Sequence, residues 1–245
     1  MYAHRSTHGP VDLAFTDRHG GVSVAPFDSL NLAITGEDDD AARRENLRRV
    51  LDDFAPGDEL ADLQQVHGGE IDVVERRRTS RRPVADGVVT ARAAVVLAVR
   101  AADCVPVLLA DPDAGVIGAA HAGRPGLVAQ VLPNTVAAMG ALGARRITAW
   151  VGPHVCGACY EVPEDMQAEV VTVEPAAEAT TSWGTPSLDL GAGIRAQLER
   201  AGVLVVDASR CTRESPDLYS YRRDGHAAGR TAGLIRQAPS AVAVQ

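Results

Sequence analysis

Apolar side chains recur along this sequence at two spacings, one typical of helices and one typical of buried strands. Between Asp40 and Phe54, the residues Leu47, Val50 and Leu51 are spaced as neighbours on one face of a helix, which Pro56 would end. Short, continuous apolar runs elsewhere are typical of strands that are buried on both faces. The pattern predicts helices over 40–54, 123–142 (with a kink or a restart at Pro133), 163–171 and 189–201, and strands over 11–16, 60–66, 71–75, 87–90, 94–100, 105–110, 115–120, 147–151 and 203–207.

These helices and strands are mixed along the chain, and no repeat, linker or low-complexity segment separates them. The sequence therefore predicts one α/β (α+β) domain over residues 1–245. Asp189 is placed to cap the last helix and Gly202 to end it.

Composition excludes several classes of function. The formal net charge is −8, which argues against a nucleic-acid partner, because phosphate neutralisation needs a basic face. All 24 basic residues are arginine, so Schiff-base chemistry and a P-loop lysine are excluded. The first ten residues hold no apolar signal segment, and the longest apolar runs are far too short for a membrane helix. We expect a soluble, cytoplasmic protein with no membrane partner.

Cys104 and His121 flank a predicted hairpin. Its loop would pair residue 110 with residue 115, and the same register places Cys104 directly opposite His121, with Cβ atoms about 5 Å apart. A thiolate and an imidazole that share one ion favour zinc or copper over magnesium or calcium. The alternative is a buried cysteine and an unrelated histidine at a sheet edge.

His67 is the natural third ligand. It follows a predicted strand and precedes Gly68 and Gly69, which allow other groups to approach closely. Three protein ligands would leave one position open, as in catalytic zinc sites. The alternative for His67 is an ordinary surface histidine.

The segment after His121 joins a predicted strand to a predicted helix. Free backbone N–H groups around Gly123 would form an anion site, which Arg124 could reinforce. The alternative is a glycine-rich turn that only permits close packing.

Two further segments carry chemical side chains. Cys156 and Cys159 form a C-x-x-C pair that suits either thiol–disulfide exchange or half of a zinc site, although there is no second such pair and Cys211 is isolated. Residues 219–224 mix tyrosines with Arg222 and its neighbour, which suits a planar or anionic ligand; the alternative is a half-exposed strand.

Taken together, short motifs along nearly the whole chain resemble the YfiH family, long described as laccase-domain or multicopper polyphenol oxidase proteins. The matching segments are Arg18-His19-Gly20-Gly21-Val22-Ser23, Ser29-Leu30-Asn31-Leu32, Glu45-Asn46, Gln65-Val66-His67-Gly68, Ala85-Asp86-Gly87, Ala102-Asp103-Cys104-Val105-Pro106, His121-Ala122-Gly123, Gly152-Pro153, Tyr160-Glu161-Val162, Cys211-Thr212 and Ser220-Tyr221-Arg222-Arg223-Asp224.

The resemblance implies mixed β-sheets packed together and flanked by helices, and a zinc site, with copper as the alternative metal. His67, Cys104 and His121 match the family's metal ligands and would be the catalytic residues. Family members are described as purine nucleoside phosphorylases for adenosine, inosine and methylthioadenosine, with adenosine deaminase activity. The implied partners are a small nucleoside and phosphate, and we expect a monomer. Gly123, Arg124, Asn46 and Arg222 are the candidate anion-binding or substrate-binding residues.

One departure from the family concerns the residues after His121. The family usually has Trp-Arg where this chain has Arg124-Pro125, so the guanidinium is displaced by one residue. Three other functions stay open at this point. They are hydrolysis of a peptidoglycan precursor with Cys104 as nucleophile or the metal activating water, copper-dependent phenol oxidation, and metal binding without catalysis.

Overall fold

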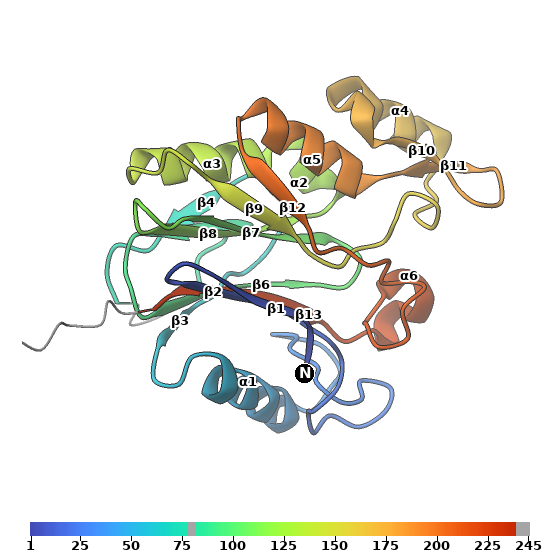
Figure 1. Cartoon of the computed structure of the whole chain (residues 1–245). Helices are drawn as coiled ribbons and strands as arrows, with labels where there is room; N and C mark the ends of the chain where they lie inside the picture. Colours follow the sequence, from blue (N-terminus) through green and yellow to red (C-terminus); the bar gives the residue numbers. More distant parts are fainter. Residues whose placement is uncertain (78–81, 239–245) are drawn as a thin grey trace, which may run out of the picture.

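Two stacked β-sheets form the centre of the molecule (Figure 1). The computed structural model describes residues 1–77 and 82–238. Within these residues the first sheet has the strand order β1-β2-β13-β6-β3, and the second has the order β12-β9-β7-β8-β5-β4. The strands of the first sheet are β1 (Tyr2–His8), β2 (Val11–Thr16), β3 (Glu59–Ala61), β6 (Val95–Ala101) and β13 (Thr231–Gln237). Those of the second are β4 (Ile71–Val73), β5 (Gly87–Thr90), β7 (Val105–Asp111), β8 (Val116–Ala122), β9 (Thr148–Val151) and β12 (Leu204–Asp207).

Helices cover the outer face of each sheet. Helix α1 (Asp40–Phe54) lies on the first sheet, and α2 (Arg124–Val128), α3 (Val131–Ala141) and α5 (Leu190–Arg200) lie over the second (Figure 1). Helix α4 (Glu164–Val173) packs outside these helices. The hairpin of β10 (Glu178–Thr180) and β11 (Pro186–Leu188), the short helix α6 (Tyr221–Asp224) and the 3₁₀ turns η1 (Pro175–Ala177) and η2 (Gly225–Ala227) complete the described elements. The mixed α/β architecture is confirmed. None of the helices in the described ranges has the length and apolar character that a bilayer span requires.

The two sheets bury a shared apolar layer. Leu13 and Phe15 of the first sheet and Leu108 and Ile117 of the second belong to one cluster, and each is at most 1% exposed. Gly152, which follows β9, leaves room for the Phe15 ring, because a Cβ there would lie 2.3 Å from Phe15 Cε1. Close contact between the sheets therefore depends on a glycine opposite an aromatic ring.

Aspartate side chains cap the N-terminal ends of two helices. Asp189 caps α5, since its Oδ1 accepts from the Ala192 backbone N–H at 2.8 Å. At α1 the capping residue is Asp39, whose carboxylate accepts from the N–H groups of Ala41 and Ala42. The helices predicted over 40–54, 163–171 and 189–201 are therefore confirmed, with ends that differ by two residues or fewer.

The helical segment predicted over 123–142 restarts, as one of the two alternatives at Pro133 required. The chain forms two helices there, α2 and α3, and the break falls at Gln130, whose φ of 61° is left-handed. Pro133 lies in the first turn of the second helix, α3, a position in which its missing N–H costs nothing.

The hairpin register also differs from the prediction. Ala110 pairs with Ile117 and Pro106 pairs with His121, so the strands are displaced by two residues. Side chains alternate between faces with a period of two, and a displacement of two therefore keeps Cys104 and His121 on the same face. They are diagonal neighbours rather than directly opposed residues.

Several segments were missed or assigned to the wrong structure. The β10–β11 hairpin was not predicted, and the strand predicted over 60–66 is only the short strand β3. The edge strand β1 lacks a buried apolar run, and β13 has its apolar residues interrupted by Gly233. Residues 221–224, for which a strand was the alternative, form the short helix α6, which Ser220 caps by accepting from the Arg223 N–H.

Candidate metal centre

Asp86 organises the site from its position just before β5. Its Oδ1 accepts from the His67 backbone N–H at 2.9 Å, and its Oδ2 accepts from the N–H groups of Gly68 at 2.7 Å and Val66 at 3.1 Å. The same carboxylate lies 2.8 Å from His121 Nδ1. A fully buried carboxylate thus ties the loop that carries His67 to the imidazole at the end of β8.

His67, Cys104 and His121 converge from three places in the chain. Their ligand-type atoms all lie within 4.8 Å of one another. The two imidazole rings are almost perpendicular, with centroids 4.8 Å apart. His67 has a φ of 61°, so its strained backbone is held by the contacts of its loop with Asp86.

Gly123 makes this convergence possible. A Cβ at Gly123 would lie 2.8 Å from His67 Cδ2 and 2.9 Å from Cys104 Sγ. Both distances are below van der Waals contact, so no larger residue fits without displacing the imidazole or the thiol. The space beside Gly123 is therefore filled by the side chains of the candidate ligands.

The charges of the site favour a thiolate. Burial opposes ionisation of Cys104, but the charge of His121 and hydrogen bonds from His121 and His67 lower its pKa to about 6. Burial likewise opposes protonation of His121, whereas the Cys104 charge and the bond to Asp86 raise its pKa to about 9. Burial also works against the charge of Asp86, yet hydrogen bonds from His121, Gly68 and Val66 hold its pKa below the usual range. The three groups stabilise one another's charged forms.

The donor set fits a borderline-soft metal ion. One thiolate and two imidazoles are ligands that zinc and copper prefer, and they are poor ligands for magnesium or calcium. Because His121 presents Nδ1 to Asp86, its Nε2 is left for a metal. These residues therefore have the chemistry to hold one zinc or copper ion.

A large open cavity of about 1190 Å³ includes all three side chains in its lining. Its other walls carry two tyrosines, Tyr160 and Tyr221, and the guanidinium groups of Arg222 and Arg230. Arg222 lies over the ring of Tyr160, with Cζ 4.6 Å from the ring centroid. The cavity thus combines aromatic faces and positive charge beside the candidate metal centre.

Asp103 holds one wall of this cavity in place. Its carboxylate accepts from Thr212 Oγ1 at 2.5 Å and from the Arg222 backbone N–H at 2.6 Å. Its carbonyl oxygen accepts from the Val155 N–H at 3.1 Å. Three loops far apart in sequence therefore meet at the residue that precedes Cys104.

Of the four residues predicted to bind an anion or substrate, two lie at the cavity or the candidate ligands and two do not. Arg222 lines the cavity, and Gly123 lies against the candidate ligands. Arg124 begins α2 and is not among the residues that line the cavity. Asn46 is fully buried in α1, where it binds the loop around Ser23 and Ser29, and it does not line the cavity either.

Sequence reasoning missed the roles of Asp86, Tyr160 and Arg230. Asp86 and Tyr160 stand in family-like motifs, so their presence was visible, but their position beside the ligands was not. Arg230 lies in none of the family-like motifs. It reaches the cavity because β13, which follows it directly, lies in the middle of the first sheet.

Comparison with known proteins identifies the family of this chain. The model of the family described as multi-copper polyphenol oxidoreductase laccase matches residues 12–238. A Streptomyces coelicolor protein named purine nucleoside phosphorylase SCO2081 is 52% identical over 242 residues, which cover 96% of this chain and 99% of that protein. A Mycobacterium tuberculosis protein named purine nucleoside phosphorylase Rv2149c is 44% identical over 224 residues, covering 90% of this chain and 89% of that protein.

Solved structures with the same fold include relatives of lower identity. The Neisseria meningitidis protein NMB0706, of the DUF152 family, superposes with a TM-score of 0.86 at 33% identity and covers 96% of this chain and 99% of its own. YlmD from Geobacillus stearothermophilus superposes with a TM-score of 0.84 at 29% identity, covering 94% of this chain and 93% of its own. The family match and the identity to curated relatives show that this chain belongs to the laccase-like YfiH (DUF152) family.

Proposed function

We propose that this protein is a zinc-dependent purine nucleoside phosphorylase that acts on adenosine, inosine and methylthioadenosine. The observation that carries the proposal is the position of His67, Cys104 and His121 in the lining of a cavity that also holds two tyrosines and four arginines, among them Arg222 and Arg230. The printed names of the relatives, which extend to 52% identity, support it.

Phosphorolysis places definite demands on such a cavity. A phosphate oxygen attacks C1′ of the ribose, the C1′–N9 bond breaks, and the purine leaves with the electron pair and gains a proton. The faces of Tyr160 and Tyr221 suit a purine ring, and the guanidinium groups of Arg222 and Arg230 suit a phosphate dianion. This chain therefore offers a surface for each substrate.

His67, Cys104 and His121 would hold the zinc ion, which when bound supplies a positive charge that stabilises negative charge in the transition state. Asp86 keeps His121 in one tautomer and fixes the orientation of its ring. Asp103 holds the Arg222 backbone at the rim of the cavity. These contacts pre-organise the binding groups before substrate enters.

The histidines weigh against copper-dependent phenol oxidation. A multicopper oxidase needs a type-1 site and a trinuclear cluster, and the latter demands many imidazoles. Of the 7 histidines, all within the described residues, His67 and His121 are the members of a potential metal-ligand group. The donor set therefore favours a mononuclear site.

Two hydrolytic activities remain as measurable alternatives at the same cavity. Deamination of adenosine would use water in place of phosphate and would release ammonia. Editing of a peptidoglycan precursor would require the Cys104 thiolate or water to attack an amide carbon. Both reactions would proceed without phosphate.

The test follows purine release from inosine in metal-defined protein, with and without phosphate. We expect release to require phosphate and metal and to be lost in His121→Ala. The control His8→Ala, an exposed histidine on β1, should keep full activity. In Arg222→Gln, we expect the phosphate KM to rise more than the nucleoside KM.

Purine release that is independent of phosphate and of His121 would reject the proposal. In that case, ammonia release from adenosine and amide cleavage of a muropeptide precursor should be measured with wild type, His121→Ala, Cys104→Ala and the control His8→Ala. Activity there, lost in His121→Ala or Cys104→Ala, would identify the chain as a hydrolase.

A further inference from the structure

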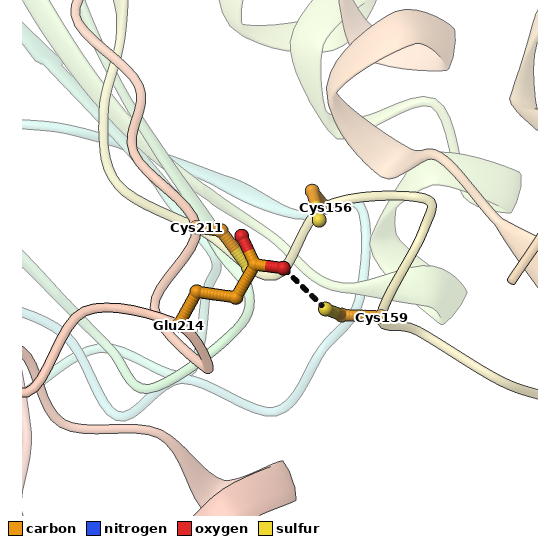
Figure 2. A group of neighbouring side chains, drawn as sticks. All are labelled: Cys156, Cys159, Cys211 and Glu214. Carbon is orange, nitrogen blue, oxygen red and sulfur yellow. Dashed lines mark hydrogen bonds between the residues drawn. The ribbon is translucent and has the colours of Figure 1, made fainter. Parts of the chain in front are cut away.

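A second group of metal-ligating side chains lies outside the candidate centre. Cys156, Cys159, Cys211 and Glu214 point toward one another (Figure 2), and their ligand-type atoms all lie within 4.8 Å of one another. Cys159 Sγ donates to Glu214 Oε1 at 3.4 Å. Cys159 is buried and Cys156 and Cys211 are half-buried, so this is a partly enclosed group of three thiols and one carboxylate.

The topology of the second sheet brings these residues together. Strands β9 and β12 are parallel neighbours, with Val151 paired with Asp207 at their carboxyl ends. The loop after β9 carries the C-x-x-C pair and the loop after β12 carries Cys211. The pairing continues into these loops, where the backbone of His154 and that of Cys211 form a bridge. The fold itself therefore fixes the relative positions of the two segments.

Each segment presents its two side chains from a tight turn. The Cys159 and Tyr160 N–H groups both donate to the Cys156 carbonyl at 3.0 Å. The Ser215 N–H donates to the Cys211 carbonyl at 3.1 Å, and the turn so formed brings Glu214 beside Cys211. Two turns that each offer two ligands at a spacing of three residues are typical of structural zinc sites.

We propose that Cys156, Cys159, Cys211 and Glu214 bind a second zinc ion, which has a structural role. Thiolates select zinc over magnesium and calcium, and four protein ligands would close the coordination shell and leave no position for substrate. The three-ligand group of His67, Cys104 and His121 differs in this respect. This second site is independent of the proposed phosphorylase activity.

The electrostatics of the group agree with a cation site. Burial and the neighbouring thiol of Cys211 raise the pKa of Cys156 to about 12. A zinc ion would displace the thiol protons. The remaining negative charge would be offset in part by Arg213, whose guanidinium is held 4.9 Å from the centroid of the Trp183 ring.

The second site lies next in sequence to residues that form one wall of the cavity. Tyr160, whose ring lines the cavity, directly follows Cys159, and Thr212, which donates to Asp103, directly follows Cys211. A zinc ion would therefore connect the two loops that hold this wall of the cavity. We expect it to stabilise the wall rather than take part in chemistry.

Metal content per chain, measured by elemental analysis of protein prepared under reducing conditions, tests the proposal. We expect two zinc ions in the wild type, one in Cys211→Ser, one in Cys104→Ala, and none in the double variant. Cobalt bound to the Cys104→Ala variant should show intense sulfur-to-cobalt charge-transfer absorption, and this absorption should disappear when Cys211→Ser is added. Removing metal with a chelator should lower the Tm of Cys104→Ala.

Glu214→Gln keeps the proposal testable if a cysteine variant fails to fold. It removes one exposed carboxylate, and we expect at least a tenfold loss of zinc affinity at the second site, measured by chelator competition in the Cys104→Ala background. Equal metal content in wild type and Cys211→Ser would overturn the proposal.

The number of zinc ions per chain is measured without any nucleoside substrate. The proposed phosphorylase function and the proposed second zinc site can therefore be rejected independently of each other. Absence of phosphorolysis with two zinc ions per chain rejects only the proposed function. Phosphorolysis by a protein that binds one zinc ion, lost in Cys104→Ala, rejects only the second site.

Discussion

At the scale of single residues, the carboxylate of Asp86 connects the parts of the candidate centre. One of its oxygens faces both the His67 N–H and the His121 ring, and the other accepts two further backbone N–H groups. An ionised carboxylate can accept all four contacts, whereas an amide offers a single acceptor oxygen. Asp86 therefore positions two of the candidate ligands at once.

We expect Asp86→Asn to weaken zinc binding at the His67–Cys104–His121 site by about 10-fold to 100-fold, because the orientation and basicity of His121 depend on this contact. Competition with a chelator measures the affinity. Glu70→Gln, which alters an exposed carboxylate in the same region, should bind zinc as the wild type does. If Asp86→Asn bound zinc with the wild-type affinity, the Asp86 carboxylate would not be needed to orient His121 for zinc binding.

A second prediction concerns the space beside Gly123. In Gly123→Ala, the new methyl group would lie 2.9 Å from Cys104 Sγ and 2.8 Å from His67 Cδ2, so we expect loss of zinc from this site and loss of activity. Gly140→Ala is the matched control, since a Cβ there meets no atom within 4 Å. Gly140→Ala should bind zinc normally and gain up to about 1 kcal/mol in the free energy of unfolding from helix propensity.

The three candidate ligands could be predicted from the sequence, but the residues that hold them and the cavity wall in position could not. His67, Cys104 and His121 were reached from residue type, strand ends and hairpin spacing, which are local properties of the chain. Asp86 acts through contacts with residues 18 to 35 positions away, and Asp103 accepts from the Arg222 N–H, 119 positions away. Local pattern holds no information about such contacts.

At the scale of elements, Asp111 joins the end of β7 to the segment before β9. Its Oδ1 accepts from the Ala114 N–H at 3.1 Å, and its Oδ2 accepts from the N–H groups of Arg145 at 2.6 Å and Arg146 at 2.8 Å. Burial would raise the pKa of Asp111, but these backbone hydrogen bonds lower it below its ordinary value of 3.8.

We expect Asp111→Asn to lower the free energy of unfolding by about 1 kcal/mol at pH 7, because an NH₂ group replaces one of the two oxygens of a buried carboxylate that accept these N–H groups. A carboxyl whose pKa is lower in the folded state stabilises the protein above its unfolded pKa and loses that effect as pH falls. The difference in the free energy of unfolding between wild type and Asp111→Asn should therefore become smaller as the pH falls below 3.8. Urea unfolding at several pH values measures it.

Asp113→Asn is the control for this prediction, since Asp113 contacts Arg146 through an exposed ion pair, for which measured contributions are about 0–1 kcal/mol. An equal loss of stability in both variants would show that the three backbone contacts of Asp111 contribute little.

Secondary structure was predictable where the signal is local. Helix α1 and helix α5 have apolar periodicity and acidic caps, and both were found. Register and helix breaks depend on packing. Gln130 adopts a left-handed backbone between α2 and α3, and the β7–β8 hairpin closes with the pair Asp111–Val116 instead of the predicted pair of residues 110 and 115. Even so, a displacement by two residues preserved the face on which Cys104 and His121 lie.

At the scale of the whole molecule, the two sheets depend on one another. Phe15 of the first sheet is 1% exposed and packs into a cluster that includes Leu108 and Ile117 of the second. The sequence predicted the mixed α/β class from its alternating elements. It did not predict how two sheets would stack, because inward-facing and outward-facing residues are both apolar in strands such as β7.

This shared layer underlies our prediction that residues 1–245 fold as one domain. We expect a single cooperative unfolding transition, with equal calorimetric and van't Hoff enthalpies. Phe15→Ala should lower the free energy of unfolding by about 3–5 kcal/mol without splitting that transition, because the cavity weakens both sheets together. Val24→Ala, at a residue 75% exposed, should leave stability unchanged. Two separate transitions, only one of them sensitive to Phe15→Ala, would instead show that each sheet and its helices form an independent unit.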